Sequence, residues 1–318
     1  MQEHYQFLGT EAVAASPRMR DLFQQVRTAA QTEGPVLLVG EPGCGKEIVA
    51  RAIHHYSARK LNPFVDLSCA ALPEDLLDAE LFGHERGAFS GASAMKPGLL
   101  EMAHQGSVFL DNVESLNERL QAKLSRVLDQ GTFFRVGAAR QTRADVRLIA
   151  AASGELPRPG SVRNQLFSQL SHTTLTVPPL RERHEDIEAL ACHFLAQQNP
   201  DLRFAADAMI ALYSYRWPGN VRELRNAVLR SALMAKGPLL HADDIVFTLR
   251  QSVGTEQCLA DERGIEGVEQ AMIRRAMAES GGHRQRAADS LGISKTTLCR
   301  RIRSYGLVLG LEEIRRLA

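Results

Sequence analysis

Short apolar runs alternate with amphipathic segments of helix length through the first 180 or so residues of the chain. The runs are 35–39, 64–67, 107–110 and 146–150. A helical segment with apolar positions Met19, Leu22, Phe23 and Val26 precedes the first run. Short, nearly continuous apolar strands separated by helices are typical of a parallel sheet covered on both faces. The pattern predicts an α/β domain with a parallel sheet.

The periodicity changes after the α/β region. From His184 to about Arg250 no strand pattern occurs, and amphipathic segments at 187–196, 206–215 and 221–234 predict a small helical lid. A polar stretch rich in Ser, Gly, Thr, Glu and Asp follows, and then a second helical unit. We therefore expect the domain limits to be 1–183, 184–250, a linker at 251–263, and 264–318.

Composition narrows the class of protein. Charged residues make up 24% and hydrophobic residues 44% of the 318 positions, which is ordinary for globular domains. No signal peptide or membrane-spanning run is visible, so we expect a cytoplasmic protein without membrane contact. The five cysteines form no Cys-x-x-Cys pair, which argues against a disulfide framework or a structural zinc site. Arginines cluster towards the carboxyl end, where nucleic acid is a candidate partner.

A phosphate-binding pattern, G-x-x-x-x-G-K, lies between the first apolar run and a helical segment at 48–56. Its glycines let the backbone wrap phosphates, and the helix amino terminus adds partial positive charge. Lys46 adds a mobile cation for the β- and γ-phosphates of ATP. The alternative is a glycine turn that merely precedes a lysine. The candidate nucleotide-binding residues of this loop are Gly40, Glu41, Gly43, Cys44, Gly45, Lys46 and Glu47.

The apolar run at 107–110 ends in Asp111 and Asn112. A carboxylate in the place of Asp111 is suited to hold Mg²⁺ through water. The amide of Asn112 orients water but does not accept its proton. Glu114 is a possible replacement base, but we expect its side chain to point elsewhere, because the strand has ended two residues earlier.

The segment Gly87-Ala-Phe-Ser-Gly-Ala92 predicts a tight, hairpin-like loop, because glycines at both ends tolerate unusual backbone angles. Phe89 at its tip is costly to leave in water unless it meets a partner. The alternative is that Phe89 packs into the core.

These motifs, together with Trp217-Pro-Gly-Asn-Val-Arg222-Glu-Leu-Arg-Asn226, resemble the AAA+ activators of sigma-54 RNA polymerase. The resemblance runs over 40–226 and implies an AAA+ P-loop domain, a helical lid and a C-terminal helix-turn-helix. It also implies that Arg222 contacts the γ-phosphate. The implied sigma-54 contact residues are Gly87, Ala88, Phe89, Ser90, Gly91 and Ala92.

Several positions depart from the family pattern. Ser90 replaces Thr, Asn112 replaces the catalytic Glu, and Ser68 replaces the Asn that restrains it. The polar group of the sensor I segment is reduced to Ser153. Of two arginines that act across the subunit interface, Arg163 is kept and Gln169 replaces the other. The candidate catalytic residues are therefore Asp111, Asn112, Ser153 and Arg163, and we expect ATP binding with weakened hydrolysis. Slow turnover through well-placed water is the alternative.

The segment 281–303 reads as helix, glycine turn, helix and resembles the Fis-type helix-turn-helix. Its predicted apolar seam is Ala287, Leu291, Ile293, Leu298 and Ile302. Ser294 is a plausible N-cap for a recognition helix in the major groove of double-stranded DNA. The candidate DNA contacts are Arg284, Lys295, Thr296, Thr297, Arg300 and Arg301. We expect the preceding segment, 265–277, to dimerise. A solvated basic hairpin is the alternative.

The sequence thus predicts a transcription activator that binds ATP and Mg²⁺, forms a ring, docks on sigma-54 RNA polymerase and binds upstream DNA. Only a short stretch precedes the α/β domain, so we expect no receiver domain and control by a separate regulatory protein, a co-activator or expression level. One alternative is a non-catalytic subunit that joins a competent paralogue in a mixed ring. Another is a DNA-binding regulator that uses the AAA+ core only as a scaffold.

Overall fold

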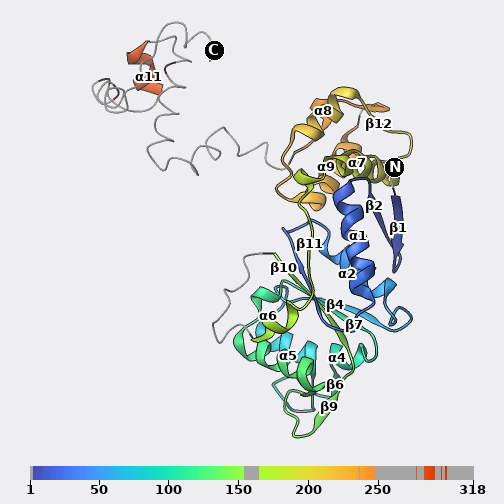
Figure 1. Ribbon diagram of the computed structural model, residues 1–318. Helices are drawn as coiled ribbons and strands as arrows, with labels where there is room; N and C mark the ends of the chain where they lie inside the picture. Colours follow the sequence, from blue (N-terminus) through green and yellow to red (C-terminus); the bar gives the residue numbers. More distant parts are fainter. Residues whose placement is uncertain are drawn as a thin grey trace. The chain divides into compact units, whose positions relative to one another are not determined.

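The computed structural model describes residues 3–153, 165–235, 237–247, 277, 283–290, 295 and 298. The chain divides into two compact units, Met1–Val246 and Phe247–Ala318. The first unit contains a five-stranded sheet, the helices around it and a group of helices after it (Figure 1).

A parallel sheet forms the centre of the first unit, in the strand order β11-β3-β10-β7-β4. Its strands are β3 (Val36–Val39), β4 (Phe64–Ser68), β7 (Ser107–Asp111), β10 (Arg147–Ala152) and β11 (Thr174–Thr176). All six residues of the central strand β10 are buried, and all of them except Arg147 are apolar. The four predicted strands are confirmed, and β11 is an additional edge strand.

Helices cover both faces of the sheet. On one face lie α1 (Pro17–Ala30) and α2 (Lys46–Tyr56), which pack on Val36, Leu38 and Ile149. The other face packs through Leu37, Leu148 and their neighbours on α3 (Glu74–Phe82), α4 (Leu99–Met102), α5 (Glu118–Gln130) and α6 (Gln165–Leu170). Neighbouring residues of one strand thus belong to opposite cores, as the strand geometry requires.

Three antiparallel hairpins decorate this unit. The first, β1 (Glu3–Phe7) with β2 (Thr10–Ala14), turns at Leu8 and Gly9, which both have positive φ. The second pairs β5 (Gly83–His84) with β6 (Lys96–Pro97), and the third pairs β8 (Thr132–Phe134) with β9 (Gln141–Arg143). A 3₁₀ turn, η1 (Val113–Ser115), follows β7.

The lid consists of α7 (His184–Gln198), α8 (Ala206–Ser214) and α9 (Asn220–Met234), which Figure 1 shows grouped at one end of the unit. The 3₁₀ turns η3 (Leu180–Glu182) and η4 (Ala242–Asp244) flank these helices. Trp217 is fully buried and donates from Nε1 to Leu212 O (2.9 Å). The expectation of a strand-free lid is wrong in one respect, because β12 (Arg203–Phe204) pairs in parallel with β13 (Leu239–Leu240). Runs of two residues are too short to produce a readable strand pattern.

In the second unit the described residues include one helix, α11 (Arg284–Ser290). Met277, Ala288 and Leu298 are buried, whereas Arg284 and Lys295 are exposed. Leu298 belongs to the predicted apolar seam, and Ala288 was not predicted to be buried. In the part of the chain that the structure describes, no helix is long and apolar enough to cross a membrane.

Candidate functional site

The phosphate loop lies between β3 and α2, and its lysine is fixed by three hydrogen bonds. Lys46 Nζ donates to Gly40 O (2.8 Å), Glu41 O (3.1 Å) and Ser153 Oγ (2.6 Å). The loop also passes very close to the lid: a Cβ added at Gly43 would lie 2.4 Å from Gly219 O. Gly43 has a positive φ of 75°, so both its backbone angle and its surroundings require glycine.

A second set of contacts joins the loop to the lid through Glu41. Its carboxylate accepts two hydrogen bonds from the Arg181 guanidinium, at 2.6 and 2.8 Å, and this pairing lowers the pKa of Glu41. Asn220 Nδ2 donates to Glu41 Oε2 and to Pro42 O, both at 3.1 Å, and Asn220 Oδ1 accepts from Leu180 N (2.7 Å). Asn220 is fully buried, so this amide holds the start of α9 against the phosphate loop.

Arg183 and Asp186 tie the other end of the lid. The buried Arg183 guanidinium donates to Cys44 O (2.5 Å) and lies 3.7 Å from Asp186 Oδ2. Asp186 Oδ1 accepts from Ala15 N (2.6 Å) and Ser16 N (2.7 Å), and its Oδ2 accepts from Ser16 Oγ (2.9 Å). The lid is therefore bonded both to the phosphate loop and to the segment that begins α1.

Asp111 and Asn112 lie at the carboxyl end of β7, where Asp111 is in register with Ser68 of β4. Asp111 Oδ1 accepts from Asn112 N (3.0 Å), and Asn112 Nδ2 lies 3.4 Å from Ser153 Oγ. Because β10 pairs with both β3 and β7, Ser153 just past its end is brought between Lys46 and Asn112. The structure thus places together three residues that are far apart in the sequence.

Glu114 corrects the sequence-based expectation. Its carboxylate was expected to point away, but Glu114 Oε1 accepts from Ser153 N (3.0 Å) and lies 3.5 Å from Asn112 Nδ2. The reason is local: Asn112 adopts the left-handed conformation (φ 58°, ψ 47°), so the chain turns back as it leaves β7. The alternation of side chains that holds inside a strand no longer applies there.

A cavity of about 620 Å³ opens at this edge of the sheet. The phosphate-loop residues Gly43, Gly45, Lys46 and Glu47 line it together with Asp111. Arg222 lines it from α9, and its backbone N–H donates to Gly43 O (3.3 Å). The sequence did not reveal three further parts of the wall, namely Arg225, the turn of the first hairpin at Gly9 and Thr10, and His193 of α7.

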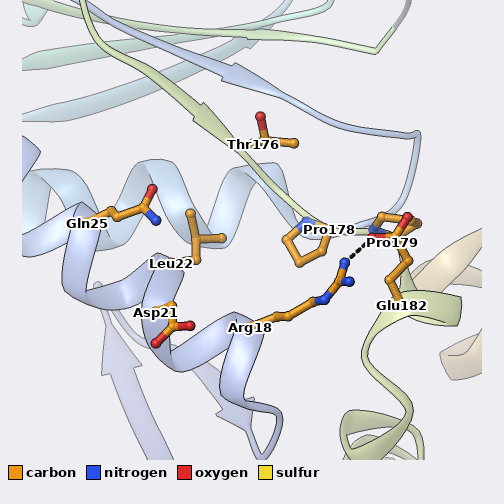
Figure 2. Close-up of a pocket in the computed structure, with 8 residues that line it drawn as sticks. All are labelled: Arg18, Asp21, Leu22, Gln25, Thr176, Pro178, Pro179 and Glu182. Atoms are coloured by element: carbon orange, nitrogen blue, oxygen red, sulfur yellow. Dashed lines mark hydrogen bonds and ion pairs between the residues drawn. The ribbon is translucent and has the colours of Figure 1, made fainter.

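A second cavity, of about 350 Å³, lies between α1, β11 and the segment that follows β11 (Figure 2). Arg18 and Glu182 form an ion pair at its rim. None of the residues predicted from the sequence to act on nucleotide line it. It is therefore a separate feature from the 620 Å³ cavity.

The loop Gly87–Ala92 is closed by its own backbone. Gly87 N donates to Ala92 O (2.8 Å), and Ala92 N donates to Phe89 O (3.0 Å). Phe89 is 41% exposed and meets the His84 ring edge-on, with the ring centroids 5.0 Å apart. Phe89 is thus outside the core, and its loop lies between β5 and β6.

A neighbouring hairpin supports this loop. Glu85 N donates to Val136 O (3.0 Å), and Arg135 pairs with both Glu85 (2.9 Å) and Glu101 (2.7 Å). The two glutamates raise the pKa of Arg135 further above its ordinary range. A Cβ added at Gly137 would lie 2.9 Å from Ala88 Cβ, so the two loops are in close contact.

Other predicted site residues are not assembled by the structure. Arg163 lies outside the described residues, as do Thr296, Thr297, Arg300 and Arg301. Gln169, in place of the second interface arginine, donates from Nε2 to Asp129 Oδ1 of α5 (2.5 Å). Cys44, Cys69 and Cys192 are free thiols, and Cys258 and Cys299 lie outside the described residues.

The comparison with protein families decides the assignment. A model of the sigma-54 interaction domain matches residues 12–176, more than half of the 318-residue chain. The chain belongs to the sigma-54 interaction domain family. In this sigma-54 interaction domain protein, residues 181–261 match the AAA+ ATPase lid domain, and residues 264–305 match bacterial regulatory proteins of the Fis family. The predicted fold class, an AAA+ P-loop domain with a parallel sheet, a lid and a C-terminal Fis-type helix-turn-helix, is confirmed.

Curated relatives are similar over most of the length of this chain. The regulatory protein AtoC of Escherichia coli (strain K12) is 39% identical over 310 residues, which cover 92% of this chain and 67% of AtoC. The nitrogen fixation protein AnfA of Azotobacter vinelandii is 39% identical over 311 residues, which cover 95% of this chain and 58% of AnfA. The sigma-54 interaction domain protein thus spans about two thirds or less of the length of these relatives.

A crystal structure of NtrX from Brucella abortus in complex with ATP is also similar, with a TM-score of 0.69 and 32% identity. The match covers 94% of this chain and 70% of the NtrX chain. The complex of NtrX with ADP gives a TM-score of 0.68 over 93% of this chain.

Proposed function

We propose that this chain is an activator of sigma-54 RNA polymerase that binds ATP and Mg²⁺, assembles into a ring and is tethered to upstream double-stranded DNA. One observation carries the proposal: Lys46, Asp111 and Arg222 line one cavity in a protein of the sigma-54 interaction domain family. The similarity to NtrX, which has been crystallised with ATP, supports ATP as the nucleotide.

Asp111 is the residue suited to hold Mg²⁺. Glu47, which follows Lys46 and also lines the cavity, forms an ion pair with Arg51 (2.7 Å). Within the described part of the chain, no cluster of three or more His, Cys, Asp or Glu side chains forms a cage for a metal ion. Mg²⁺ is commonly held by one or two carboxylates together with substrate phosphates. Asp111 therefore fits a Mg²⁺ ion that arrives bound to ATP and offsets the negative charge of the phosphates.

The residues at and near the cavity have different roles in the proposed binding and hydrolysis of ATP. Lys46 exchanges its contacts with Gly40 O and Glu41 O for phosphate oxygens, and Arg222 reaches the cavity from the first turn of α9. Ser153 and Asn112 orient water at the phosphate end of the cavity. Hydrolysis is weakened relative to family members that carry Glu, because the amide of Asn112 does not take a proton.

The loop Gly87–Ala92 is the proposed contact to sigma-54. Phe89 supplies an exposed aromatic ring on a loop that is braced by its own hydrogen bonds and by the hairpin β8–β9. A partner that covers the exposed part of this ring removes apolar surface from water, which favours binding.

The Fis-type region is the proposed DNA-binding part. The exposure of Arg284 and Lys295 beside the buried Ala288 and Leu298 supports one basic and one apolar side. Basic side chains there supply phosphate contacts, and the first turn of the recognition helix supplies base contacts. The domain limits 1–183, 184–250, 251–263 and 264–318 remain predictions, as does a separate regulatory protein.

A second candidate is a subunit that works in a mixed ring with a competent paralogue. The specific observation is Gln169, which is bonded to Asp129 of its own chain and carries no charge to offer a neighbouring subunit. In such a ring Arg163 is the residue that this chain contributes across the interface.

Two measurements test the leading proposal. Lys46→Ala should weaken binding of fluorescent ATP by roughly 10- to 100-fold, because it removes charge-assisted phosphate contacts, whereas Lys96→Ala at an exposed ion pair should not. Phe89→Ala should abolish capture of sigma-54 in the presence of a transition-state analogue of ATP, and Ser90→Thr should retain it. Absence of nucleotide binding, or no sigma-54 complex with either Ser or Thr at position 90, contradicts the proposal.

A further inference from the structure

Glu114 brings a carboxylate to Ser153, the residue whose hydroxyl accepts from the phosphate-loop lysine. The left-handed backbone of Asn112 turns the chain as it leaves β7, and η1 then presents the Glu114 side chain back to the end of β10. There Glu114 Oε1 accepts from Ser153 N (3.0 Å). The carboxylate is therefore positioned by a backbone donor and does not simply extend into solvent.

Ser153 connects this carboxylate to the phosphate-loop lysine. Its N–H donates to Glu114, and its Oγ accepts from Lys46 Nζ (2.6 Å). A single residue thus separates Glu114 from the ammonium group that is suited to bind the β- and γ-phosphates. Asn112 Nδ2 lies within 3.5 Å of Glu114 Oε1 and within 3.4 Å of Ser153 Oγ.

The side chains of Asn112 and Glu114 differ in their ability to accept a proton. An amide such as Asn112 donates to a carboxylate or a water but has no site that accepts a proton at neutral pH. A carboxylate accepts a proton, and Glu114 is exposed, so a proton that it takes up can pass on to solvent. Burial would hinder that second transfer.

We propose that Glu114 is the carboxylate that polarises the attacking water in ATP hydrolysis, in place of the glutamate that Asn112 replaces. The inference rests on the proposed ATP-dependent function. The water oxygen forms a bond to the γ-phosphorus, and the bond from that phosphorus to the β,γ-bridging oxygen breaks with its electron pair leaving on ADP. The proton of the water passes to Glu114 and then to solvent. Asn112 orients Glu114 by its amide.

A purely structural role of Glu114, as an acceptor for Ser153 N, is the competing explanation. The two roles differ in how they depend on position 112. A structural acceptor is needed whatever residue follows Asp111. A working base becomes dispensable once a glutamate is restored at position 112.

The experiment compares four chains: wild type, Glu114→Gln, Asn112→Glu and the double variant. Steady-state ATP hydrolysis is measured over a range of protein concentrations, since ring assembly depends on concentration, and binding of fluorescent ATP is measured in parallel. Glu114→Gln should lower kcat on the order of 10²-fold in the wild-type background, with nucleotide affinity retained. In the Asn112→Glu background the same change should have little effect. Glu185→Gln, at an exposed glutamate of α7, is the matched control.

Several results overturn the inference. They are wild-type turnover in Glu114→Gln, an equal loss in both backgrounds, or a wild-type chain that binds ATP without any hydrolysis. These results leave nucleotide binding intact. Failure of the wild-type chain to bind ATP at all would instead remove the proposed function on which the inference rests.

Discussion

Asn220 Nδ2 lies 3.1 Å from Glu41 Oε2, so the lid and the phosphate loop share a partly buried amide–carboxylate hydrogen bond. The same side chain accepts from Leu180 N at 2.7 Å. A change that keeps the shape of Asn220 but removes its donor tests this contact.

Asn220→Asp should destabilise the protein by about 1–3 kcal/mol, because it leaves Pro42 O without its donor and brings a second carboxylate next to Glu41. The measurement is urea unfolding, with binding of ATP as a second readout that should also weaken. Asn62→Asp, at an exposed asparagine bonded to Gln105 O, is the control. Equal unfolding curves for Asn220→Asp and the wild type would contradict the role assigned to this contact.

Asn112→Glu should raise steady-state ATP hydrolysis by about 10- to 10²-fold, since it restores a proton acceptor next to Asp111. The gain is smaller than the full range for a missing base, because Glu114 already supplies a carboxylate. Asn112→Gln, which lengthens the side chain without adding a base, should show no gain. Turnover in the wild type equal to that of Asn112→Glu would refute the weakened hydrolysis that we propose.

His54 predicts a stability loss on acidification. It is fully buried, its Nδ1 lies 2.9 Å from Ser107 Oγ, and burial lowers its pKa below the ordinary 6.5. Below about pH 6.5 the unfolded chain therefore binds a proton that the folded chain does not. The free energy of unfolding consequently decreases as the pH is lowered. His54→Gln should flatten this fall between about pH 7 and pH 5. His172→Gln, at an exposed histidine, should leave it unchanged. An identical pH dependence in His54→Gln and the wild type would show that another group is responsible.

Gly137→Ala should disturb the loop that carries Phe89. The residue has a φ of 78°, and its added Cβ would lie 2.9 Å from Ala88 Cβ, so the loop must shift. We expect weaker capture of sigma-54 with unchanged ATP binding. Gly34→Ala, where an added Cβ meets no atom within 4 Å, is the control. Normal sigma-54 capture by Gly137→Ala would mean that the support from this hairpin is dispensable.

Much of the fold could be predicted because most residues of β3, β7 and β10 are buried and apolar. The predicted strands ending at Val39, Leu67, Leu110 and Ala150 correspond to β3, β4, β7 and β10. The edge strand β11 has one buried residue among three, and the lid strands have two residues each, so neither produces a comparable pattern. The turn at Leu8 and Gly9 contains a single glycine, which is a weak hairpin signal.

The site was predictable where a motif is contiguous and less so where the backbone departs from regular geometry. Lys46, Asp111 and Arg222 were assigned from motifs and line one cavity. The position of Glu114 was predicted wrongly, because side-chain alternation was extended past a residue that adopts positive φ. The pairing of Asn220 with Glu41 joins residues that are 179 positions apart, so no local sequence pattern predicts it.

Asp186 has a kinetic consequence. Its two oxygens hold Ala15 N, Ser16 N and Ser16 Oγ, and Ser16 caps α1, which packs on the sheet. Swinging α7 away from the sheet must therefore either break these three bonds together or tilt α1 with the lid. We therefore expect the lid to separate from α1 cooperatively, because one buried carboxylate has to release three hydrogen bonds together.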